Sequence, residues 1–321
     1  MTEVRIPTYA SVVSVDDLPP VTSRPAPRRP RLWGIARTAR PKQWAKNLLV
    51  FAAPGAAGVL TELPTLARAA TAFVVFCLAA SGTYFLNDTL DREADRRHPV
   101  NRHRPVAAGL VAPRTALWVA GSLLSVSILL GLLALGAPTA GCVALYVAIN
   151  VAYNLWLRRE PVLDLAAVAS GFVLRAIVGG LATGVHLSEW FLVVTSFASL
   201  FMVAGKREGV VALDVAGAAA GKSRARPVYP AGYLRYVRAL SSGVAIAAYC
   251  LWAFDGAARA DGHAALLQLT IVPFVLAMLR YALLVESDGF EAPEDALFGD
   301  ATIVALGVIW ALLFALGVYG A

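Results

Sequence analysis

The sequence predicts an all-α polytopic membrane protein, and three observations support this prediction. Of the 321 residues, 58% are hydrophobic and only 15% are charged, and the mean hydropathy is +0.65, which is unlike a water-soluble domain. The apolar residues form long runs without the alternation of a strand. Because lipid cannot hydrogen-bond the backbone, such runs cross a bilayer as helices. The basic residues, finally, gather between alternate runs.

Apolar runs of membrane-spanning length predict nine transmembrane helices. They fall near 46–61, 66–86, 115–135, 138–157, 162–184, 189–205, 236–255, 265–285 and 300–320. The first run is the least regular, because Pro54, Gly55 and Gly58 interrupt it. Residues 1–38 are polar, proline-rich and basic and lack the apolar core of a signal peptide, so we expect a disordered tail there. Residues 39–321 then form one transmembrane domain.

The distribution of lysine and arginine predicts the orientation, because positive charge resists translocation. With the N-terminus in the cytoplasm, the other side of the membrane keeps only Arg68 and Arg259. We therefore expect a multi-pass protein of the inner (plasma) membrane with its N-terminus and its active site on the cytoplasmic face. A transporter is disfavoured, because only Arg175 lies deep within a span. No nucleic-acid partner is expected.

The most informative motif is NDTLDREADRR, which begins at Asn87 at the cytoplasmic end of the second span. On a helix, Asp88, Asp91 and Asp95 fall at i, i+3 and i+7 and share one face within about 11 Å. Clustered carboxylates suit Mg²⁺, which binds one or two of them and completes its shell with water and phosphate oxygens. The alternative is a solvated helix end whose acids pair with Arg92 and Arg96.

Basic and polar side chains near this motif are candidates for binding phosphate groups. The alternative for Arg175 is a structural pair with another helix, and for the other cations it is an ordinary interfacial or cytoplasmic role. The candidates are Lys42 and Lys46 before the first span, Arg97 and Arg104 after the aspartates, Tyr153 and Arg158 at the turn after the fourth span, Arg175 within the fifth, and Lys206 and Arg207 at the end of the sixth. Arg175 lies about 16 Å along its helix from Asp164, too far for the two to pair.

The NDxxDxxxD pattern after the second helix resembles the UbiA superfamily of intramembrane prenyltransferases. The stretches RPKQWAKNLLVFAAP, NDTLDREADRRHPVNRHRPVAAG and LRAIVGG, with KRE after the sixth span, are similar to the branch that acts on polyprenyl phosphates. The resemblance implies a UbiA-like bundle. It also implies transfer of 5-phosphoribosyl from phosphoribosyl diphosphate (PRPP) to decaprenyl (polyprenyl) phosphate with Mg²⁺, for cell-wall arabinan synthesis.

The resemblance also implies roles for individual residues. Asp88, Asp91 and Asp95 would hold Mg²⁺ and the diphosphate, with Asn87 supporting them, and the cations named above would neutralise phosphates. Two departures stand out: Arg158 replaces the usual lysine, and KRE replaces the second aspartate motif of the superfamily. The alternative is a prenyltransferase that uses a prenyl diphosphate and an aromatic acceptor, which the number of cations disfavours. The oligomeric state stays open, and a homo-oligomer is one option.

Overall fold

The computed structural model describes residues 31–215, 229–230, 232–259, 264–288 and 299–320, and this part of the chain contains helices and no strand. The N-terminal helices are α1 (Arg31–Thr38), η2 (Pro41–Phe51), α2 (Ala52–Ala56), α3 (Leu63–Leu90), α4 (Arg92–Arg97), η3 (Asn101–His103), α5 (Pro113–Leu135), α6 (Ala137–Leu155), η4 (Leu157–Arg159) and α7 (Pro161–Thr183). The C-terminal helices are α8 (Glu189–Val215), α9 (Tyr233–Arg259), α10 (Ala264–Leu269), α11 (Ile271–Asp288) and α13 (Ala301–Tyr319). The all-α prediction is confirmed.

Eight helical segments of the described chain are long and apolar enough to cross a membrane, which makes the protein an integral membrane protein. They match the second to ninth predicted spans. The predicted first span, 46–61, is instead the 11-residue 3₁₀ helix η2 followed by the five-residue α2. The count of nine therefore stays a prediction.

The segment η2–α2 is extended and packs deeply, although it is not a long α-helix. At about 2.0 Å per residue for a 3₁₀ helix and about 1.5 Å for an α-helix, it is roughly 30 Å long, close to the thickness of the hydrocarbon core. Val50 is fully buried. A side chain at Gly179 of α7 would overlap the carbonyl oxygen of Val50, so glycine permits this close approach.

The eighth predicted span is divided between α10 and α11, which Thr270 separates. Pro273 explains the division, because it lacks the N–H that would bond to the carbonyl of Leu269 one turn earlier. The Thr270 hydroxyl also accepts a hydrogen bond from Tyr249 of α9 at 2.8 Å, which fixes the break against a neighbouring helix.

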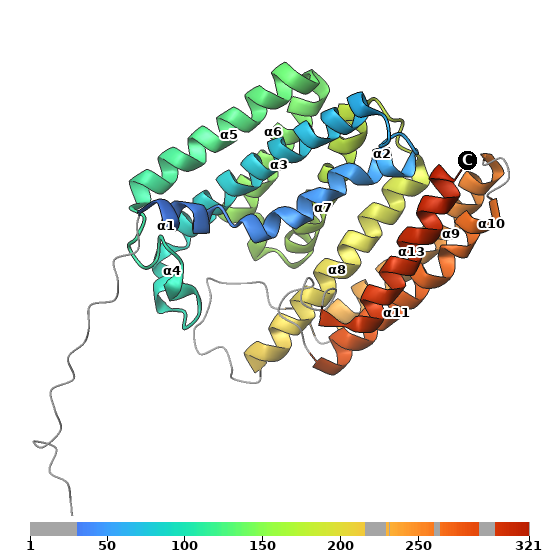
Figure 1. Cartoon of the computed structure of the whole chain (residues 1–321). Helices are drawn as coiled ribbons and strands as arrows, with labels where there is room; N and C mark the ends of the chain where they lie inside the picture. The colour runs from blue at the N-terminus through green and yellow to red at the C-terminus, as the bar shows by residue number, and fades with distance from the viewer. Residues whose placement is uncertain (1–30, 216–228, 231, 260–263, 289–298, 321) are drawn as a thin grey trace, which may run out of the picture.

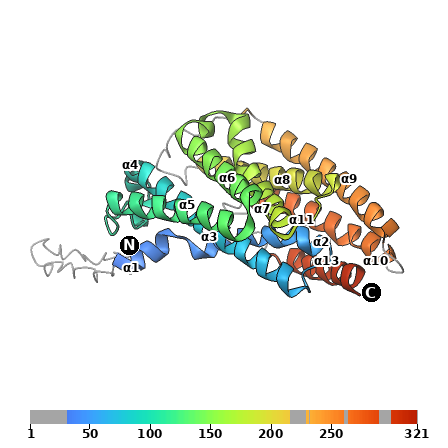
Figure 2. The same ribbon diagram turned by 90° about the horizontal axis from the view of Figure 1, so that it is seen from above.

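The helices form two groups, which Figures 1 and 2 show side by side: α1 to α7 in one, α8 to α13 in the other. Helix α3 is the centre of the first group and contacts η2, α5, α6 and α7, and α7 contacts α8 across the boundary. The apolar, membrane-spanning stretch of α3 is 61% buried, whereas the corresponding stretch of α13 is only 11% buried. Helix α13 is thus a lipid-facing helix. Helix α3 is surrounded by its neighbours, so the residues at its end have fixed positions.

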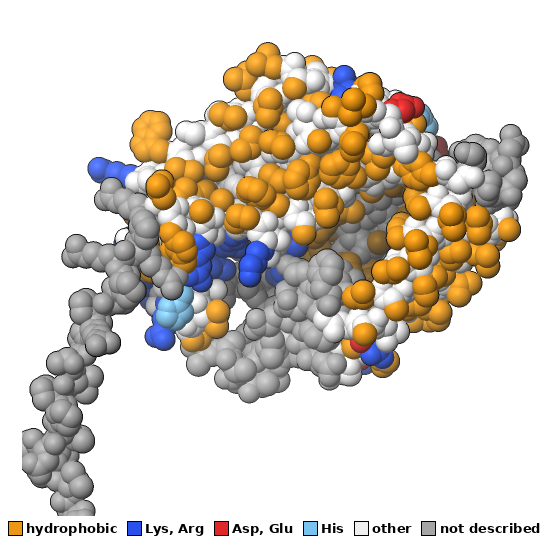
Figure 3. Space-filling view, viewed as in Figure 1, with side chains coloured by type: hydrophobic (Ala, Val, Ile, Leu, Met, Phe, Trp, Pro, Cys, Tyr) orange, Lys and Arg blue, Asp and Glu red, His pale blue; other side chains and the backbone are white. Residues whose placement is uncertain are grey.

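The surface agrees with a membrane protein that has one polar end. Apolar side chains cover the sides of the helices, and lysine and arginine gather at one end of the first group (Figure 3). Part of the predicted tail is a helix, because residues 31–38 form α1. Ile35 of α1 packs against a buried cluster that includes Phe85, Val106 and Val111, and this packing explains the order. Residues 1–30 lie outside the described part.

Candidate active site

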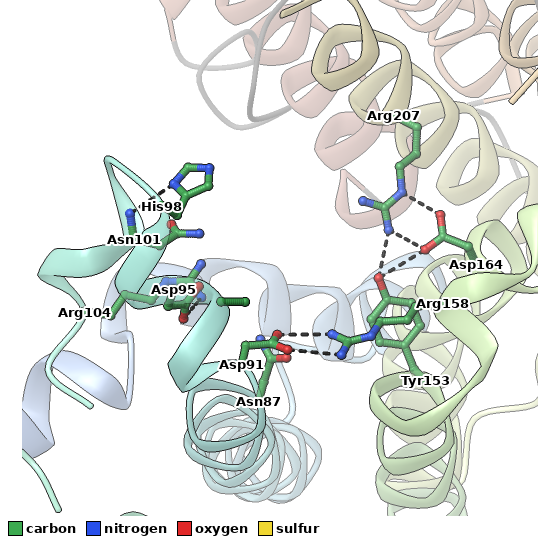
Figure 4. A pocket seen from close by; sticks show the side chains of 11 residues that line it. Asn87, Asp91, Asp95, His98, Asn101, Arg104, Tyr153, Arg158, Asp164 and Arg207 are labelled. Atoms are coloured by element: carbon green, nitrogen blue, oxygen red, sulfur yellow. Dashed lines mark hydrogen bonds and ion pairs between the residues drawn. The ribbon is translucent and has the colours of Figure 1, made fainter. Parts of the chain in front are cut away.

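A polar pocket opens where the ends of α3, α6, α7 and α8 meet α4 and η3 (Figure 4). It encloses about 670 Å³ of space between the protein atoms, part of which is open to solvent. Its lining residues are Asn87, Asp91, Ala94, Asp95, His98, Asn101, Arg104, Tyr153, Arg158, Asp164 and Arg207. Seven of the thirteen predicted site residues are therefore brought together: Asn87, Asp91, Asp95, Arg104, Tyr153, Arg158 and Arg207.

The three aspartates of the motif do not lie on one unbroken helix, so the predicted i, i+3, i+7 stripe needs correction. Helix α3 ends at Leu90 and α4 begins at Arg92, and Asp91 between them has φ −92° and ψ 1°. Asp91 and Asp95 line the pocket. Asp88 lies in the last turn of α3, outside the pocket lining and only 1% exposed.

Each of these carboxylates is paired with arginine. Arg158 donates to both oxygens of Asp91, at 3.1 Å each. Arg104 bridges Asp95 at 2.8 Å and Asp88 at 3.5 Å. Burial raises the pKa of Asp95 above its usual value, while Arg104 opposes that rise. The arginines therefore compensate the negative charges of the acids.

Arg40 is a site residue that sequence reasoning missed. It caps η2 in the left-handed region, with φ 53°, which is uncommon for a residue other than glycine. Its guanidinium donates to Asp88 and lies over the ring of Tyr84, 4.8 Å from the centroid. Arg40 begins the RPKQW stretch, but from the sequence we assigned roles only to the lysines that follow it.

Asp164 of α7 forms the opposite rim of the pocket and was also missed as a site residue. It is 1% exposed and accepts hydrogen bonds from Arg207 at 2.7 Å through both oxygens, from Tyr153 at 3.1 Å and from Tyr229 at 2.6 Å. Burial and the bond to Asp164 raise the pKa of Tyr229, so its hydroxyl stays a donor at neutral pH. These bonds fix the orientation of Arg207.

Arg175 does not line the pocket. It is 6% exposed and donates to Asn47 of η2 at 2.7 Å, to Tyr146 of α6 at 3.2 Å and to the carbonyl of Gly171. The rings of Phe76, Tyr146 and Phe172 surround its guanidinium within 6 Å. Arg175 thus joins η2, α6 and α7. No contact between Arg175 and Asp164 is found, as their separation along the helix predicted.

Five further predicted residues lie apart from the pocket lining: Lys42, Lys46, Asp88, Arg97 and Lys206. Lys42 and Arg97 are exposed. Asp88 contacts the pocket indirectly, through Arg104. The role of the lysines in binding phosphate stays a prediction.

The pocket could hold a metal ion only if the protein supplied few of the ligands of that ion. Within the described ranges, no group of three His, Cys, Asp or Glu side chains is close enough to hold an ion. Mg²⁺, however, usually takes one or two carboxylates and fills its shell with water and phosphate oxygens. Asp91 and Asp95, two hard oxygen donors on one pocket wall, fit that pattern.

Comparisons with known proteins agree with this description. A sequence model of the UbiA prenyltransferase family matches residues 48–303. Decaprenyl-phosphate phosphoribosyltransferase from Corynebacterium glutamicum is 40% identical over 89% of this chain and 87% of its own length. The protein of the same name from Mycolicibacterium smegmatis is 42% identical over 86% of this chain and 90% of its own.

Solved structures share the fold. A UbiA homologue from Archaeoglobus fulgidus, bound to GPP and Mg²⁺, superposes with a TM-score of 0.64 over 90% of this chain and 100% of that protein, at 16% identity. A digeranylgeranylglyceryl phosphate synthase superposes with a TM-score of 0.63 over 91% of this chain and 99% of its own, also at 16% identity.

Proposed function

The chain belongs to the UbiA prenyltransferase family, and within it we propose that this protein transfers 5-phosphoribosyl from PRPP to decaprenyl (polyprenyl) phosphate and releases diphosphate. The named relatives at 40% and 42% identity cover most of both chains and support this reaction. The observation that carries the proposal is the pocket itself, which is lined by three aspartates and three arginines. A prenyl diphosphate alone would need fewer cations.

The reaction needs charge compensation more than acid–base chemistry. The acceptor phosphate is already ionised at neutral pH, so no general base is required. Bound Mg²⁺ would offset the charge that develops on the departing diphosphate. Asp91 and Asp95 would hold that ion, and Asp88 would position Arg104 behind them. The structures of metal-bound homologues support the use of a divalent ion.

Arginine side chains would provide further stabilisation of the negative charge on the phosphate groups. Arg104 and Arg158 now bind the carboxylates that the metal would occupy. Both guanidinium groups would also fit the phosphate oxygens of the donor with a bidentate fork. Catalysis then rests on positioning the two substrates and on fixed positive charge.

The pocket end of the bundle faces the cytoplasm in this proposal, because PRPP is a soluble, highly charged molecule. The clustering of lysine and arginine at that end supports the orientation (Figure 3). A single cysteine placed at Arg68 should then react with an impermeant thiol reagent from the opposite side only, in a variant whose three native cysteines are replaced.

The decisive experiment uses the purified protein with labelled PRPP, decaprenyl phosphate and Mg²⁺. We expect a labelled lipid, loss of the product with EDTA and its return when Mg²⁺ is added in excess. The parallel arm supplies a prenyl diphosphate and an aromatic acceptor. Activity in that arm alone would overturn the proposed reaction in favour of ordinary prenyl transfer.

A further inference from the structure

PRPP carries a diphosphate on C1 and a separate phosphate monoester on C5, so its site needs two anion-binding regions. Asp91 and Asp95 with their metal account for the first, on the proposed function. We propose that His98 and Arg207, which face one another from opposite walls of the pocket, bind the 5-phosphate. This inference depends on the proposed function and assigns the part of the donor that a prenyl diphosphate lacks.

His98 presents a fixed hydrogen-bond donor to the pocket. Its Nδ1 accepts the backbone N–H groups of Val100 and Asn101, at 3.3 Å each. A ring nitrogen that accepts carries no proton, so the proton of the neutral imidazole is on Nε2. His98 lines the pocket, and the Nε2 edge of its ring is turned toward the wall that bears Arg207 (Figure 4).

Arg207 presents a second donor from α8. Its Nε and one terminal nitrogen bind Asp164, and the same terminal nitrogen reaches Tyr153 at 2.9 Å. The other terminal nitrogen points into the space between the walls (Figure 4). Because the Arg207 side chain is only 13% exposed and held on one edge, its remaining N–H groups have a defined direction.

The charges of the pocket explain why these two donors are needed. Three aspartates and three arginines line it, and their formal charges cancel. Metal and diphosphate would engage Asp91, Asp95 and their arginines, but Asp164 keeps Arg207 on the other wall. A phosphate monoester must therefore find N–H donors away from the metal, and His98 and Arg207 are there.

The phosphate group of the lipid acceptor has the same chemistry and is the competing source. His98 favours the donor, because it lies after α4, beyond the end of the membrane-spanning helix α3. A soluble substrate arrives from that side. Asn101, which also lines the pocket, belongs to the same segment.

The test is the substitution His98→Asn. An asparagine can still accept backbone N–H groups two and three residues ahead, but it has no donor at the position of Nε2. Ribose 5-phosphate and inorganic diphosphate serve as competitive probes, each against PRPP. We expect ribose 5-phosphate to inhibit the variant at least about 10-fold more weakly, from loss of a hydrogen bond to a charged group. Inhibition by diphosphate and the KM for decaprenyl phosphate should change less than about twofold.

The matched control is His103→Asn, in the same segment at an exposed position outside the pocket lining, which should leave both inhibition constants unchanged. Unaltered inhibition by ribose 5-phosphate in the folded His98 variant would overturn the assignment. A rise in the KM for decaprenyl phosphate instead would assign these donors to the lipid. If the unsubstituted protein transfers nothing from PRPP, the proposed function itself fails, and this outcome is separate from the other two.

Discussion

Arg158 and Asp91 form a bidentate ion pair, with both hydrogen bonds at 3.1 Å, although they are 67 residues apart in the sequence. Arg158 belongs to η4 between two spans, whereas Asp91 separates α3 from α4. The pair therefore joins the two walls of the pocket at its base (Figure 4). It also places a guanidinium beside a carboxylate that would hold the metal.

Replacing Asp91 with asparagine should abolish turnover. The amide keeps the shape of the side chain but loses the charge that binds a metal, so we expect kcat to fall at least about 100-fold. Transfer from labelled PRPP measures the loss. Glu93→Gln is the matched control, because Glu93 lies in the same motif with its side chain 67% exposed, and its activity should be unchanged. Full activity in the Asp91 variant would exclude this aspartate from the mechanism.

Arg158→Lys tests whether the fork geometry is used. Lysine keeps the charge but offers a point contact in place of two parallel bonds. We expect a KM for PRPP that rises about 3- to 10-fold, from loss of one of two charge-assisted bonds, with folding preserved. Arg159→Lys, at the exposed neighbouring position, is the control. Equal kinetics for the Arg158 variant and the unsubstituted protein would show that charge alone suffices.

The pair of Asp164 and Arg207 should contribute to stability as well as to binding. Asp164→Ala leaves a largely buried guanidinium without its counter-charge, which typically costs about 3 kcal/mol or more. We expect thermal unfolding in detergent to shift down strongly. Tyr229→Phe removes a hydroxyl that donates to Asp164 at 2.6 Å and is 3.2 Å from the carbonyl oxygen of Pro161, and should cost about 1 kcal/mol.

The double variant Asp164→Leu with Arg207→Met separates the two roles. It removes both charges, so much of the lost stability should return, while transfer from PRPP should not. Recovery of activity together with stability would contradict a binding role for Arg207.

The sequence predicted the spans well because lipid imposes one simple condition, about 20 apolar residues in a row. It did not predict that Pro41–Phe51 form a 3₁₀ helix, which reaches further per residue than an α-helix. Pro54 and Gly55, which interrupt the apolar run in the sequence, lie within the short helix α2. The position of Gly179 against Val50 could not be foreseen, because it depends on how two separate helices pack.

For the site, the motif around Asp91 identified one wall of the pocket, since its residues are neighbours in the sequence. The other wall is built from residues far apart along the chain, such as Asp164 and Tyr229, which are 65 positions apart. Because Arg175 lies within a predicted membrane span, the sequence indicated a functional role for it. Its partner, Asn47, is 128 residues away, so only the structure identifies its role as a link between helices.

Arg175 should therefore affect stability rather than substrate binding. Arg175→Lys cannot reach Asn47, Tyr146 and Gly171 together, so buried acceptors lose their partner at a cost of about 1 to 3 kcal/mol. We expect a lower unfolding temperature in detergent and a KM for PRPP within about twofold in the folded fraction. A large rise in that KM with unchanged stability would instead place Arg175 in the site.

Asp300 gives a prediction about pH. It caps α13 by accepting the N–H of Ile303 at 2.9 Å, and Arg280 of α11 donates to both of its oxygens, at 3.3 and 2.7 Å. Hydrogen bonding from Arg280 lowers the pKa of Asp300. A lowered pKa in the folded state means that the ionised form stabilises the fold above the usual aspartate pKa of about 3.9, and that this stability is lost as the pH falls through the folded-state value.

The substitution Asp300→Asn keeps a helix cap but cannot ionise. Its unfolding temperature should thus be lower than that of the unsubstituted protein at pH 7, and the difference should shrink as the pH falls below about 4. A difference that stays constant down to acid pH would mean that the ionisation of Asp300, and so its charge pair with Arg280, does not cause the difference.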